Sequence, residues 1–331
     1  MTNLTYHAYQ VGAPKQAAEL VTLTEADLPE GDLTVRVTHS SLNYKDGLAM
    51  TGKPGVVRTF PLTCGIDLSG TVVEAGGGFA GGDEVVLTGA NLSETRPGGF
   101  SGYQRIEAGS VVKAPMRLGT WGAMAVGTAG LTAMLCILRL RAAGIEPGSG
   151  PVLVTGATGG VGSFAVGALS RLGYEVHAST GKEAEEPYLK DLGATEVIPR
   201  DSLSAETSAL GKQRWIGCID SVGGATLANV LSQVKYSGAV AACGLAGGLG
   251  LPATVMPFIL RNVSLLGVDS VNASPELRRE AWAELDHLFS ADDLRAVAVD
   301  AGWEQLPELS HKILTGTIRG RVVVDITGMA N

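Results

Sequence analysis

The stretch Pro151-Val-Leu-Val-Thr-Gly-Ala-Thr-Gly-Gly-Val-Gly162 joins a short β-branched apolar run to a glycine-rich turn, and a helical pattern follows from Ser163 to Leu172. Ala157, Gly159 and Gly162 occupy the small-residue positions of the G-x-G-x-x-G fingerprint. In that motif the first residue allows the tight turn, the second lets backbone approach a pyrophosphate, and the third lets the helix pack on its strand. The stretch therefore predicts a dinucleotide-binding strand–turn–helix unit whose helix N-terminus meets the phosphate charge.

The alternation of strand and helix patterns around this unit supports the interpretation. Because the chain holds 46 glycines among 331 residues, a glycine-rich turn by itself could be purely structural. However, apolar strand patterns recur with helical or connecting segments between them, at 151–155, 175–179, 195–198, 216–220, 238–243 and 264–269. Such alternation predicts an α/β fold with a doubly wound, six-stranded parallel sheet of the Rossmann type.

The segments on either side of this sheet follow another pattern. Residues 1–117 contain short alternating runs punctuated by Gly and Pro, which predict a β-rich domain. After Ser270 come two helical patterns and a terminal strand pattern at 321–326, which do not continue the βα rhythm. We therefore expect a catalytic domain formed by 1–125 and 272–331, enclosing a dinucleotide-binding domain at 126–271.

Composition excludes several classes of protein. With 45% hydrophobic and 18% charged residues, the chain is typical of a well-buried globular enzyme. A net charge of −8 argues against nucleic acid and anionic membranes as partners. The uncharged segment from Leu118 to Leu138 is long enough to span a bilayer, yet glycine and threonine dilute it, so no membrane span is predicted.

Cysteine usage and the N-terminus predict the cytoplasm. The four cysteines, at 64, 136, 218 and 243, are too scattered for a C-x-x-C metal or redox pair and sit among apolar residues. The first ten residues lack a basic region followed by an apolar one, so no export signal is expected.

The second strand pattern indicates which dinucleotide binds. It ends where a Rossmann fold places the residue that reads the adenosine ribose, and an acid there would hold a 2′-hydroxyl. Here Ser179-Thr180-Gly181-Lys182 offers hydroxyls and a cation, which suit a 2′-phosphate and predict NADP(H). Glu183 is the one residue here that would disfavour a 2′-phosphate, but an acidic residue in the first turn of a helix is ordinary complementation of the helix dipole.

The pattern Thr155-Gly156-x-x-x-Gly160-x-Gly162 also fits the short-chain dehydrogenases. That class needs a downstream Tyr-x-x-x-Lys, in which the lysine helps the tyrosine act as an acid. Each tyrosine at 174, 188 and 236 is followed four residues later by alanine, leucine or valine. The catalytic pair is missing, so this class is excluded.

A mid-chain fingerprint after a β-rich domain resembles the medium-chain dehydrogenase/reductase superfamily. The likeness is to its zinc-free quinone-oxidoreductase-like branch, and within that branch to the NADPH-dependent acrylyl-CoA reductases. It is carried by the stretches 41–46 (Ser-Leu-Asn-Tyr-Lys-Asp), 60–67 (Phe-Pro-Leu-Thr-Cys-Gly-Ile-Asp), 127–136, 188–194, 199–201, 241–248 (Ala-Ala-Cys-Gly-Leu-Ala-Gly-Gly) and 255–262. The resemblance implies a GroES-like catalytic domain and reduction of acrylyl-CoA to propionyl-CoA.

Zinc ligands known in other members of the superfamily are replaced here. Leu42-Asn43-Tyr44 stands where zinc enzymes carry a ligand cysteine, and Gly65-Ile66-Asp67 replaces their Gly-His-Glu. No cysteine lies between Cys64 and Cys136 to form a structural zinc lobe, and the five histidines show no ligand spacing. We expect no metal.

Without a metal, the chemistry most compatible with the site is hydride addition to a carbon–carbon double bond conjugated to a carbonyl. Charge then develops on the carbonyl oxygen, and a proton reaches the α-carbon. Tyr44 is our first choice beside the nicotinamide, with Asn43 as a hydrogen-bond donor and Asp67 as an orienting group. The competing interpretations are that Tyr44 only packs on the ribose, and that Asn43 and Asp67 cap a turn or pack the domain.

The resemblance also implies the cofactor contacts. The expected pyrophosphate contacts are Thr158, Gly159, Gly160 and Val161, and the expected 2′-phosphate contacts are Ser179, Thr180, Gly181, Lys182 and Arg200. The expected nicotinamide contacts are Tyr44, Leu245 and Val268, and the weaker expected cofactor contacts are Ser270 and Arg319. Arg200 could instead be a simple surface residue.

Two rival functions and one assembly remain open at this point. An NADPH quinone oxidoreductase would need a wide apolar acceptor cleft, and a non-catalytic NADPH-binding regulatory or structural protein would share the fold. The last strand pattern, Ser264-Leu-Leu-Gly-Val-Asp269, is apolar and expected at a sheet edge, so we predict a homodimer through that edge.

Replacing Lys182 or Arg200 by Ala should raise the KM for NADPH and leave the weak activity with NADH nearly unchanged. Each charge-assisted hydrogen bond to the 2′-phosphate contributes about 1.5–3 kcal/mol, so the rise should be roughly tenfold or more, and smaller where solvent screens the contact. Steady-state kinetics with both cofactors measures it. Equal losses with NADPH and NADH would mean that these residues support the fold instead.

Overall fold

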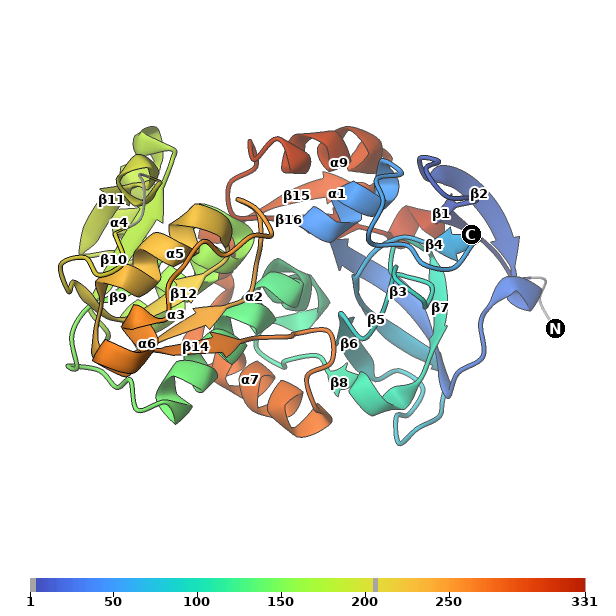
Figure 1. Cartoon of the computed structure of the whole chain (residues 1–331). Helices are drawn as coiled ribbons and strands as arrows, with labels where there is room; N and C mark the ends of the chain where they lie inside the picture. Colours follow the sequence, from blue (N-terminus) through green and yellow to red (C-terminus); the bar gives the residue numbers. More distant parts are fainter. Residues whose placement is uncertain (1–3, 205–207, 331) are drawn as a thin grey trace. The chain divides into compact units, whose positions relative to one another are not determined.

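The computed structural model describes residues 4–204 and 208–330. The chain forms two compact units (Figure 1), and each is described by itself. The first contains the residues up to Thr128 and those from Ser270 onward, and the second is Ala129–Asp269. The division into domains at 125/126 and 271/272 stays a prediction.

The first unit is built on two β-sheets. The larger has seven strands in the order β15-β16-β3-β5-β6-β8, with β7 also paired to β3, and the smaller has the order β2-β1-β4. The strands are β1 (Thr5–Val11), β2 (Glu19–Thr24), β3 (Leu33–Ser41), β4 (Leu62–Thr63), β5 (Asp67–Glu74), β6 (Glu84–Thr88), β7 (Tyr103–Ile106), β8 (Val112–Lys113), β15 (Ala298–Gly302) and β16 (Arg321–Asp325). Val35, Val37 and Leu68 lie at the centre of the core and are fully buried.

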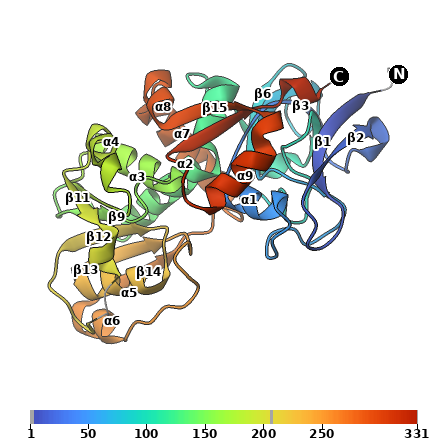
Figure 2. The same ribbon diagram turned by 90° about the horizontal axis from the view of Figure 1, so that it is seen from above.

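The terminal strand completes this sheet. β16 pairs antiparallel with β3 and parallel with β15, so residues more than 280 positions apart become neighbours. Besides the start of α2, the described residues of this unit form the helices α1 (Tyr44–Met50), α7 (Pro275–Leu288), α8 (Ala291–Val297) and α9 (Leu306–Leu314). α1 packs beside α9 (Figures 1 and 2), where a side chain at Gly47 would come within 2.6 Å of Ile313 Cγ2.

The second unit contains one parallel sheet of six strands in the order β11-β10-β9-β12-β13-β14. This is the doubly wound order with its reversal between β9 and β12, so the predicted Rossmann sheet is confirmed. The strands are β9 (Val152–Val154), β10 (Val176–Thr180), β11 (Glu196–Pro199), β12 (Trp215–Asp220), β13 (Val234–Ala242) and β14 (Ser264–Gly267). Leu153, Cys218 and Val240 are fully buried in its core, as expected for strands covered on both faces.

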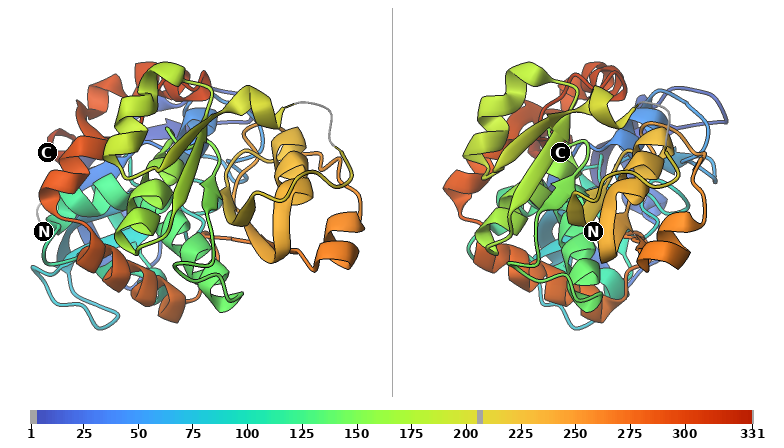
Figure 3. Two further views of the ribbon diagram at one scale, coloured as in Figure 1. Left: turned by 90° about the vertical axis from the view of Figure 1, so that its left-hand side faces the viewer. Right: turned by 60° about the vertical axis from the view of Figure 1, so that its left-hand side comes forward.

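Helices cover both faces of this sheet (Figures 2 and 3). They are α3 (Gly160–Arg171), α4 (Glu186–Asp191), α5 (Gly224–Gln233) and α6 (Met256–Arg261). Right-handed crossovers put α3 and α4 on one face and α5 and α6 on the other, because the strand order runs in opposite directions from β9 and β12. The carboxyl ends of the strands therefore form one edge with a crevice at the reversal point.

The glycine-rich turn joins β9 to α3. Gly156, with a φ of 60°, takes the left-handed position, whereas the sequence pattern assigned the tight turn to Ala157. The reason is that the chain turns directly after β9, one residue before the fingerprint begins. A side chain at Gly162 would lie 2.3 Å from the Gly156 carbonyl oxygen and 2.5 Å from Ala157 Cα, so the start of the helix packs closely on the turn that follows β9.

α2 (Gly119–Ala142) is a long apolar helix with non-helical backbone at Gly127 (φ 52°, ψ −160°). By length and composition it could cross a membrane, but 83% of its most apolar window is buried inside the protein. Core helices of water-soluble proteins pass the same test. The absence of a membrane span stays a prediction.

Replacing Gly162 by Ala should lower the free energy of unfolding by about 1–3 kcal/mol, because the new methyl group would overlap backbone that cannot move aside. Urea unfolding followed by circular dichroism measures this change. Gly250→Ala is the matched control, since a side chain there meets nothing within 4 Å and the backbone is not left-handed. Equal stability of the two variants would contradict the packing role.

Candidate active site

Asp67 is a fully buried carboxylate at the start of β5. Its Oδ2 accepts hydrogen bonds from Ser41 Oγ (2.5 Å), Asn43 Nδ2 (2.8 Å) and the Thr128 amide (2.9 Å), and its Oδ1 accepts one from Thr128 Oγ1 (2.5 Å). The donors come from β3, from the residue before α1 and from α2. Four hydrogen bonds satisfy a buried carboxylate, which therefore holds these segments together.

Arg321, the first residue of β16, is 3% exposed and lies beside this carboxylate. Its Nη2 donates to Ser41 Oγ (2.7 Å) and lies 3.8 Å from Asp67 Oδ2. Its Nη1 donates to Asn43 Oδ1 (3.0 Å) and to a backbone carbonyl at Leu42 (3.2 Å). Burial lowers the pKa of Arg321, and the negative charges of Asp67 and Asp46 oppose that shift.

Gly127 makes room for this pair. A side chain at Gly127 would come within 2.6 Å of Arg321 Nη2, 2.7 Å of Asp67 Oδ2 and 2.8 Å of Ser41 Oγ. The positive φ at this position also favours glycine. The break in α2 and the buried ion pair therefore depend on the same missing side chain.

Asp46, in the first turn of α1, adds a second buried carboxylate. Its Oδ1 accepts from the Ile66 amide (2.8 Å), and its Oδ2 accepts from the amide (2.8 Å) and Nδ2 (3.1 Å) of Asn43. Burial and the charge of Asp67 raise the pKa of Asp46 to about 7, although these hydrogen bonds act in the opposite direction. Only Asp67 forms an ion pair with Arg321, so a proton held at Asp46 removes the second buried negative charge.

The three residues expected to act in catalysis differ in exposure. Tyr44 begins α1 and is 46% exposed, whereas Asn43 is 8% exposed and Asp67 is fully buried. Asn43 precedes α1 at the capping position, and both side chains belong to the buried network, as the capping and packing interpretation requires. Catalytic roles for these three residues stay predictions.

Two expected cofactor contacts also belong to the first unit. The carbonyl of Ser270 accepts a hydrogen bond from Arg278 Nη2 (2.9 Å), and Arg319 is exposed in the turn before β16. Roles for Ser270 and Arg319 in cofactor binding stay predictions.

In the second unit, the predicted pyrophosphate residues gather where α3 begins. Gly159 is the N-cap of α3, Gly160 and Val161 begin the helix, and Thr158 is buried just before it. Thr158 Oγ1 lies 3.2 Å from Thr180 Oγ1 at the end of β10. The first amide groups of this twelve-residue helix therefore lie at the glycine-rich turn, and free amide groups at a helix N-terminus suit a phosphate.

The predicted 2′-phosphate residues are brought together by strand register. Thr180 pairs with Pro199, so Arg200 follows opposite Gly181, where a side chain would lie 2.7 Å from Arg200 Cζ. Thr180 Oγ1 accepts a hydrogen bond from the Lys182 amide (3.0 Å). Ser179 is buried, and its carbonyl accepts a hydrogen bond from the Ala157 amide (3.0 Å). The Arg200 side chain is 59% exposed, and its Nε lies 3.9 Å from Asp201 Oδ1.

Asp220, the last residue of β12, fixes the adjoining turns, and the sequence patterns did not indicate it. Its Oδ1 accepts from Thr155 Oγ1 (2.6 Å) and its Oδ2 from the Gly223 amide (2.8 Å). Ser221 Oγ donates to the Thr155 carbonyl (3.1 Å). Burial raises the pKa of Asp220. The ends of β9 and β12, on either side of the crevice, are thereby joined.

The two predicted nicotinamide neighbours in this unit lie at the same strand ends. Leu245 is 57% exposed in the loop after β13, and Val268 follows β14 with its amide bonded to the Ala242 carbonyl (3.0 Å). Their contacts with nicotinamide stay predictions.

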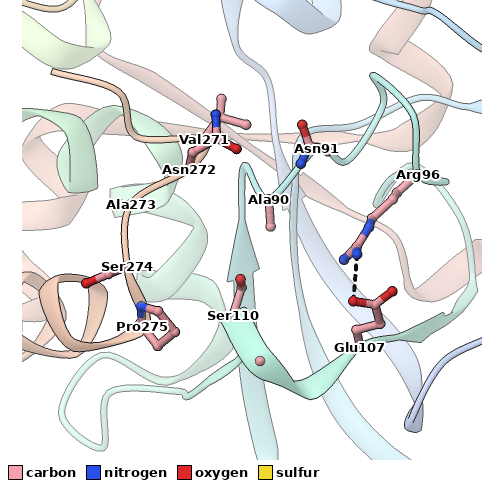
Figure 4. A pocket seen from close by; sticks show the side chains of 11 residues that line it. Ala90, Asn91, Arg96, Glu107, Ser110, Val271, Asn272, Ala273, Ser274 and Pro275 are labelled. Atoms are coloured by element: carbon pink, nitrogen blue, oxygen red, sulfur yellow. Dashed lines mark hydrogen bonds and ion pairs between the residues drawn. The ribbon is translucent and has the colours of Figure 1, made fainter. Parts of the chain in front are cut away.

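A surface pocket of about 280 Å³ lies elsewhere in the first unit (Figure 4), between residues 90–96, 107–110 and 271–275. Arg96 and Glu107 in its lining form an ion pair at 2.6 Å. The pair neutralises its own charges, and none of the residues expected at the reaction site lines this pocket. It is therefore not the candidate active site.

Metal ligands do not gather in this structure. Within residues 4–204 and 208–330, no group of three or more His, Cys, Asp or Glu side chains is arranged to hold a metal ion. Independence from zinc stays a prediction that rests on the replaced ligand positions.

Comparison with known protein families agrees with the fold. Residues 29–117 match the alcohol dehydrogenase GroES-like domain, and residues 160–290 match the family described as zinc-binding dehydrogenase. A GroES-like unit joined to a dinucleotide-binding sheet defines a class of oxidoreductases. The chain belongs to the medium-chain dehydrogenase/reductase superfamily.

Individual relatives define the subgroup. The chain is 48% identical to the probable acrylyl-CoA reductase AcuI of Escherichia coli, over 94% of this chain and 96% of the relative. It is 48% identical to the acrylyl-CoA reductase AcuI of Ruegeria pomeroyi, over 94% and 95%. It is also 45% identical, over 92% and 93%, to YhfP of Bacillus subtilis, whose name places it among quinone oxidoreductases.

Two solved structures have the same fold at high sequence identity. The YhdH oxidoreductase of Salmonella enterica in complex with NADP superposes with a TM-score of 0.93 at 46% identity, covering 97% of this chain and 99% of that one. YhfP of Bacillus subtilis with NAD bound superposes with a TM-score of 0.92 at 43% identity, over 97% and 99%.

Sequence reasoning singled out Asn43 and Asp67 but not the other members of the buried network. Ser41, Asp46 and Thr128 appeared only within the stretches that carry the resemblance, and Arg321 appeared only as the start of the terminal strand pattern. A charged residue opening the apolar run Arg321-Val-Val-Val was an available signal, because an arginine is rarely buried unless it is paired. Its partner could not be named, since Asp67 lies more than 250 residues away.

Replacing Arg321 by Met should lower the free energy of unfolding by about 3–5 kcal/mol, because Asp67 and Asp46 would remain buried without a cation. Chemical denaturation measures the change, and adding Asp67→Asn should restore part of it. Arg279→Met is the matched control, since that side chain is 60% exposed in an ion pair with Glu276 and should contribute less than about 1 kcal/mol. A loss as small as the control's would contradict the central role of Arg321.

Proposed function

We propose that this protein is an NADPH-dependent oxidoreductase that reduces the carbon–carbon double bond of a short α,β-unsaturated acyl-CoA, converting acrylyl-CoA to propionyl-CoA. The observation that carries the proposal is 48% identity over 94% of the chain to two proteins named as acrylyl-CoA reductases. Identity of this extent covers both the catalytic unit and the dinucleotide-binding sheet.

The residues of the second unit fit a phosphorylated dinucleotide. Gly159 is the N-cap of α3, and Thr158 to Val161 would hold the pyrophosphate at this helix N-terminus. Thr180, Lys182 and Arg200 would hold the ribose 2′-phosphate. When bound, NADPH supplies the hydride that is added to the β-carbon of the substrate.

The first unit would stabilise the negative charge that develops on the substrate carbonyl and would supply the proton that reaches the α-carbon. Tyr44 is the exposed member of the catalytic set, and its hydroxyl would hold the proton that reaches the α-carbon, or would pack on the ribose. Asn43 and Asp67 act as positioning residues, because their polar atoms bond within the buried network and fix the start of α1. The thioester carbonyl stabilises the intermediate charge without a metal in this scheme.

A quinone oxidoreductase is the second candidate function. The 45% identity to YhfP favours it, because that relative's name assigns it to this activity. Both reactions would use the same cofactor site, so the acceptor decides between them.

We further propose a cytoplasmic homodimer that uses neither zinc, nucleic acid nor membrane. β14 is the edge strand of its sheet. The segment before it exposes large apolar side chains, at Leu249 (85%), Val255 (65%) and Ile259 (71%). Edge-to-edge pairing of two copies would cover this surface.

Purified protein should oxidise NADPH rapidly with acrylyl-CoA, slowly with a quinone and not without an acceptor, and mass spectrometry should identify propionyl-CoA. Faster turnover with the quinone would establish the second candidate function.

Tyr44→Phe should lower kcat by about a hundredfold if the hydroxyl transfers the proton. Tyr236→Phe is the matched control, because that tyrosine is 65% exposed on β13 and should act like the wild type. An unchanged kcat in Tyr44→Phe would mean that Tyr44 is a packing residue.

A further inference from the structure

Arg278, on α7, is a second buried arginine of the first unit. It is 1% exposed and shares the buried face of its helix with Ala281, Trp282 and Leu285. At this spacing of i, i+3, i+4 and i+7, a hydrophobic side chain would be expected at position 278. The position also lies close to the N-terminus of α7, where the helix dipole disfavours a cation. A residue that breaks such local preferences is typical of functional or strained sites.

The Arg278 guanidinium donates to backbone carbonyls from two parts of the first unit. Its Nη1 donates to the carbonyl of Thr88 at the end of β6 (2.7 Å). Its Nη2 donates to the carbonyls of Ser270 (2.9 Å) and Val271 (2.8 Å), and its Nε donates to that of Ala273 (3.2 Å). All three nitrogen atoms therefore hold backbone, and one side chain ties the segment before α7 to the end of β6.

This segment lies at the surface. Residues 268–277 are all partly or fully exposed, and residues 271–275 border the surface pocket (Figure 4). A side chain at Gly89 would lie 3.3 Å from both the Ser270 carbonyl oxygen and Val271 Cα, so the segment runs directly against the end of β6. The hydrogen bonds from Arg278 therefore fix a segment whose own side chains bury little area.

The segment continues the edge strand of the dinucleotide-binding sheet. β14 ends at Gly267, and the carboxyl ends of parallel strands form the edge at which doubly wound sheets bind their ligands. Val268 and Ser270, which directly follow, are both expected cofactor contacts. The Val268 amide bonds to the Ala242 carbonyl (3.0 Å), and the Ser270 carbonyl bonds to Arg278, with one residue between these anchors. Their positions are therefore set in the protein without a cofactor.

We propose that Arg278 is a positioning residue for dinucleotide binding, and that it holds residues 268–271 in the conformation that contacts the cofactor. The proposal rests on the proposed function insofar as the dinucleotide is NADPH. A segment that is ordered in the free protein loses little conformational freedom when the cofactor binds. Without the guanidinium, binding has to order the segment, and the cost falls on affinity and not on the chemical step.

The first test compares Arg278→Met with the wild type by fluorescence titration of NADPH and by steady-state kinetics. Methionine removes every donor of the guanidinium. The Kd and the KM for NADPH should rise by about tenfold, while kcat at saturating NADPH should stay within about twofold of the wild type. Arg279→Met is the matched control, because that side chain is 60% exposed, and it should bind NADPH as the wild type does. A folded Arg278→Met protein with wild-type affinity for NADPH, or with a lower kcat at unchanged KM, would overturn the proposal.

Arg278→Lys keeps the test decisive if Arg278→Met does not fold. Lysine retains the charge but has one nitrogen atom in place of three, so it can reach only some of the carbonyls. Its Kd for NADPH should lie between those of the wild type and Arg278→Met, at about three times the wild-type value. If Arg278→Met does not fold, unchanged NADPH affinity in Arg278→Lys would show a role in the fold alone and overturn the proposal.

Failure of the proposed function would give a different result, because NADPH binding is measured without an acyl-CoA. If the wild type binds NADPH but does not reduce acrylyl-CoA, the proposed function fails, and the affinities of the variants still test Arg278. If the wild type reduces acrylyl-CoA and Arg278→Met binds NADPH as tightly, only the positioning role fails.

Discussion

The first unit depends on a buried ion pair between Asp67 and Arg321, because neither charge could remain in the interior without the other. Removing a carboxylate and a guanidinium from water costs several kcal/mol each, which is offset only when nearly all their hydrogen-bonding groups are satisfied. Here Ser41, Asn43 and Thr128 complete the arrangement. The network therefore requires β16 to return beside β3 and α2 to bend at a glycine.

A second buried carboxylate organises the dinucleotide-binding unit in a similar manner. Asp220 joins the ends of β9 and β12 through Thr155 and Gly223, at the point where the strand order reverses. This reversal creates the crevice that such sheets use for ligands. A carboxylate bonded on both sides fixes the turns on either side of the crevice, and the backbone carbonyl of the same residue accepts a hydrogen bond from Cys243 Sγ (3.4 Å).

The superfamily resemblance gives the buried pair in the first unit a chemical meaning. Asn43 and Asp67 stand at or beside positions where zinc-dependent members carry metal ligands, and in this chain they bond to each other and to Arg321. The same network includes Asp46, whose pKa is raised to about 7 by burial and by the charge of Asp67. The part that these groups play in the reaction stays a prediction.

The sequence by itself determined the fold of the second unit, because its information is local. The glycine spacing of 157–162 and six apolar strand patterns are visible within short windows, and the strand order then follows from right-handed crossovers. The candidate cofactor residues after β9 and β10 could be named for the same reason. Tertiary structure alone decided which distant polar groups meet. Arg321 and Asp67 lie more than 250 residues apart, and no local pattern records that they touch. They pair because burial forces each charge to find a partner, and the packing of β16, β3 and β5 determines which partner that is.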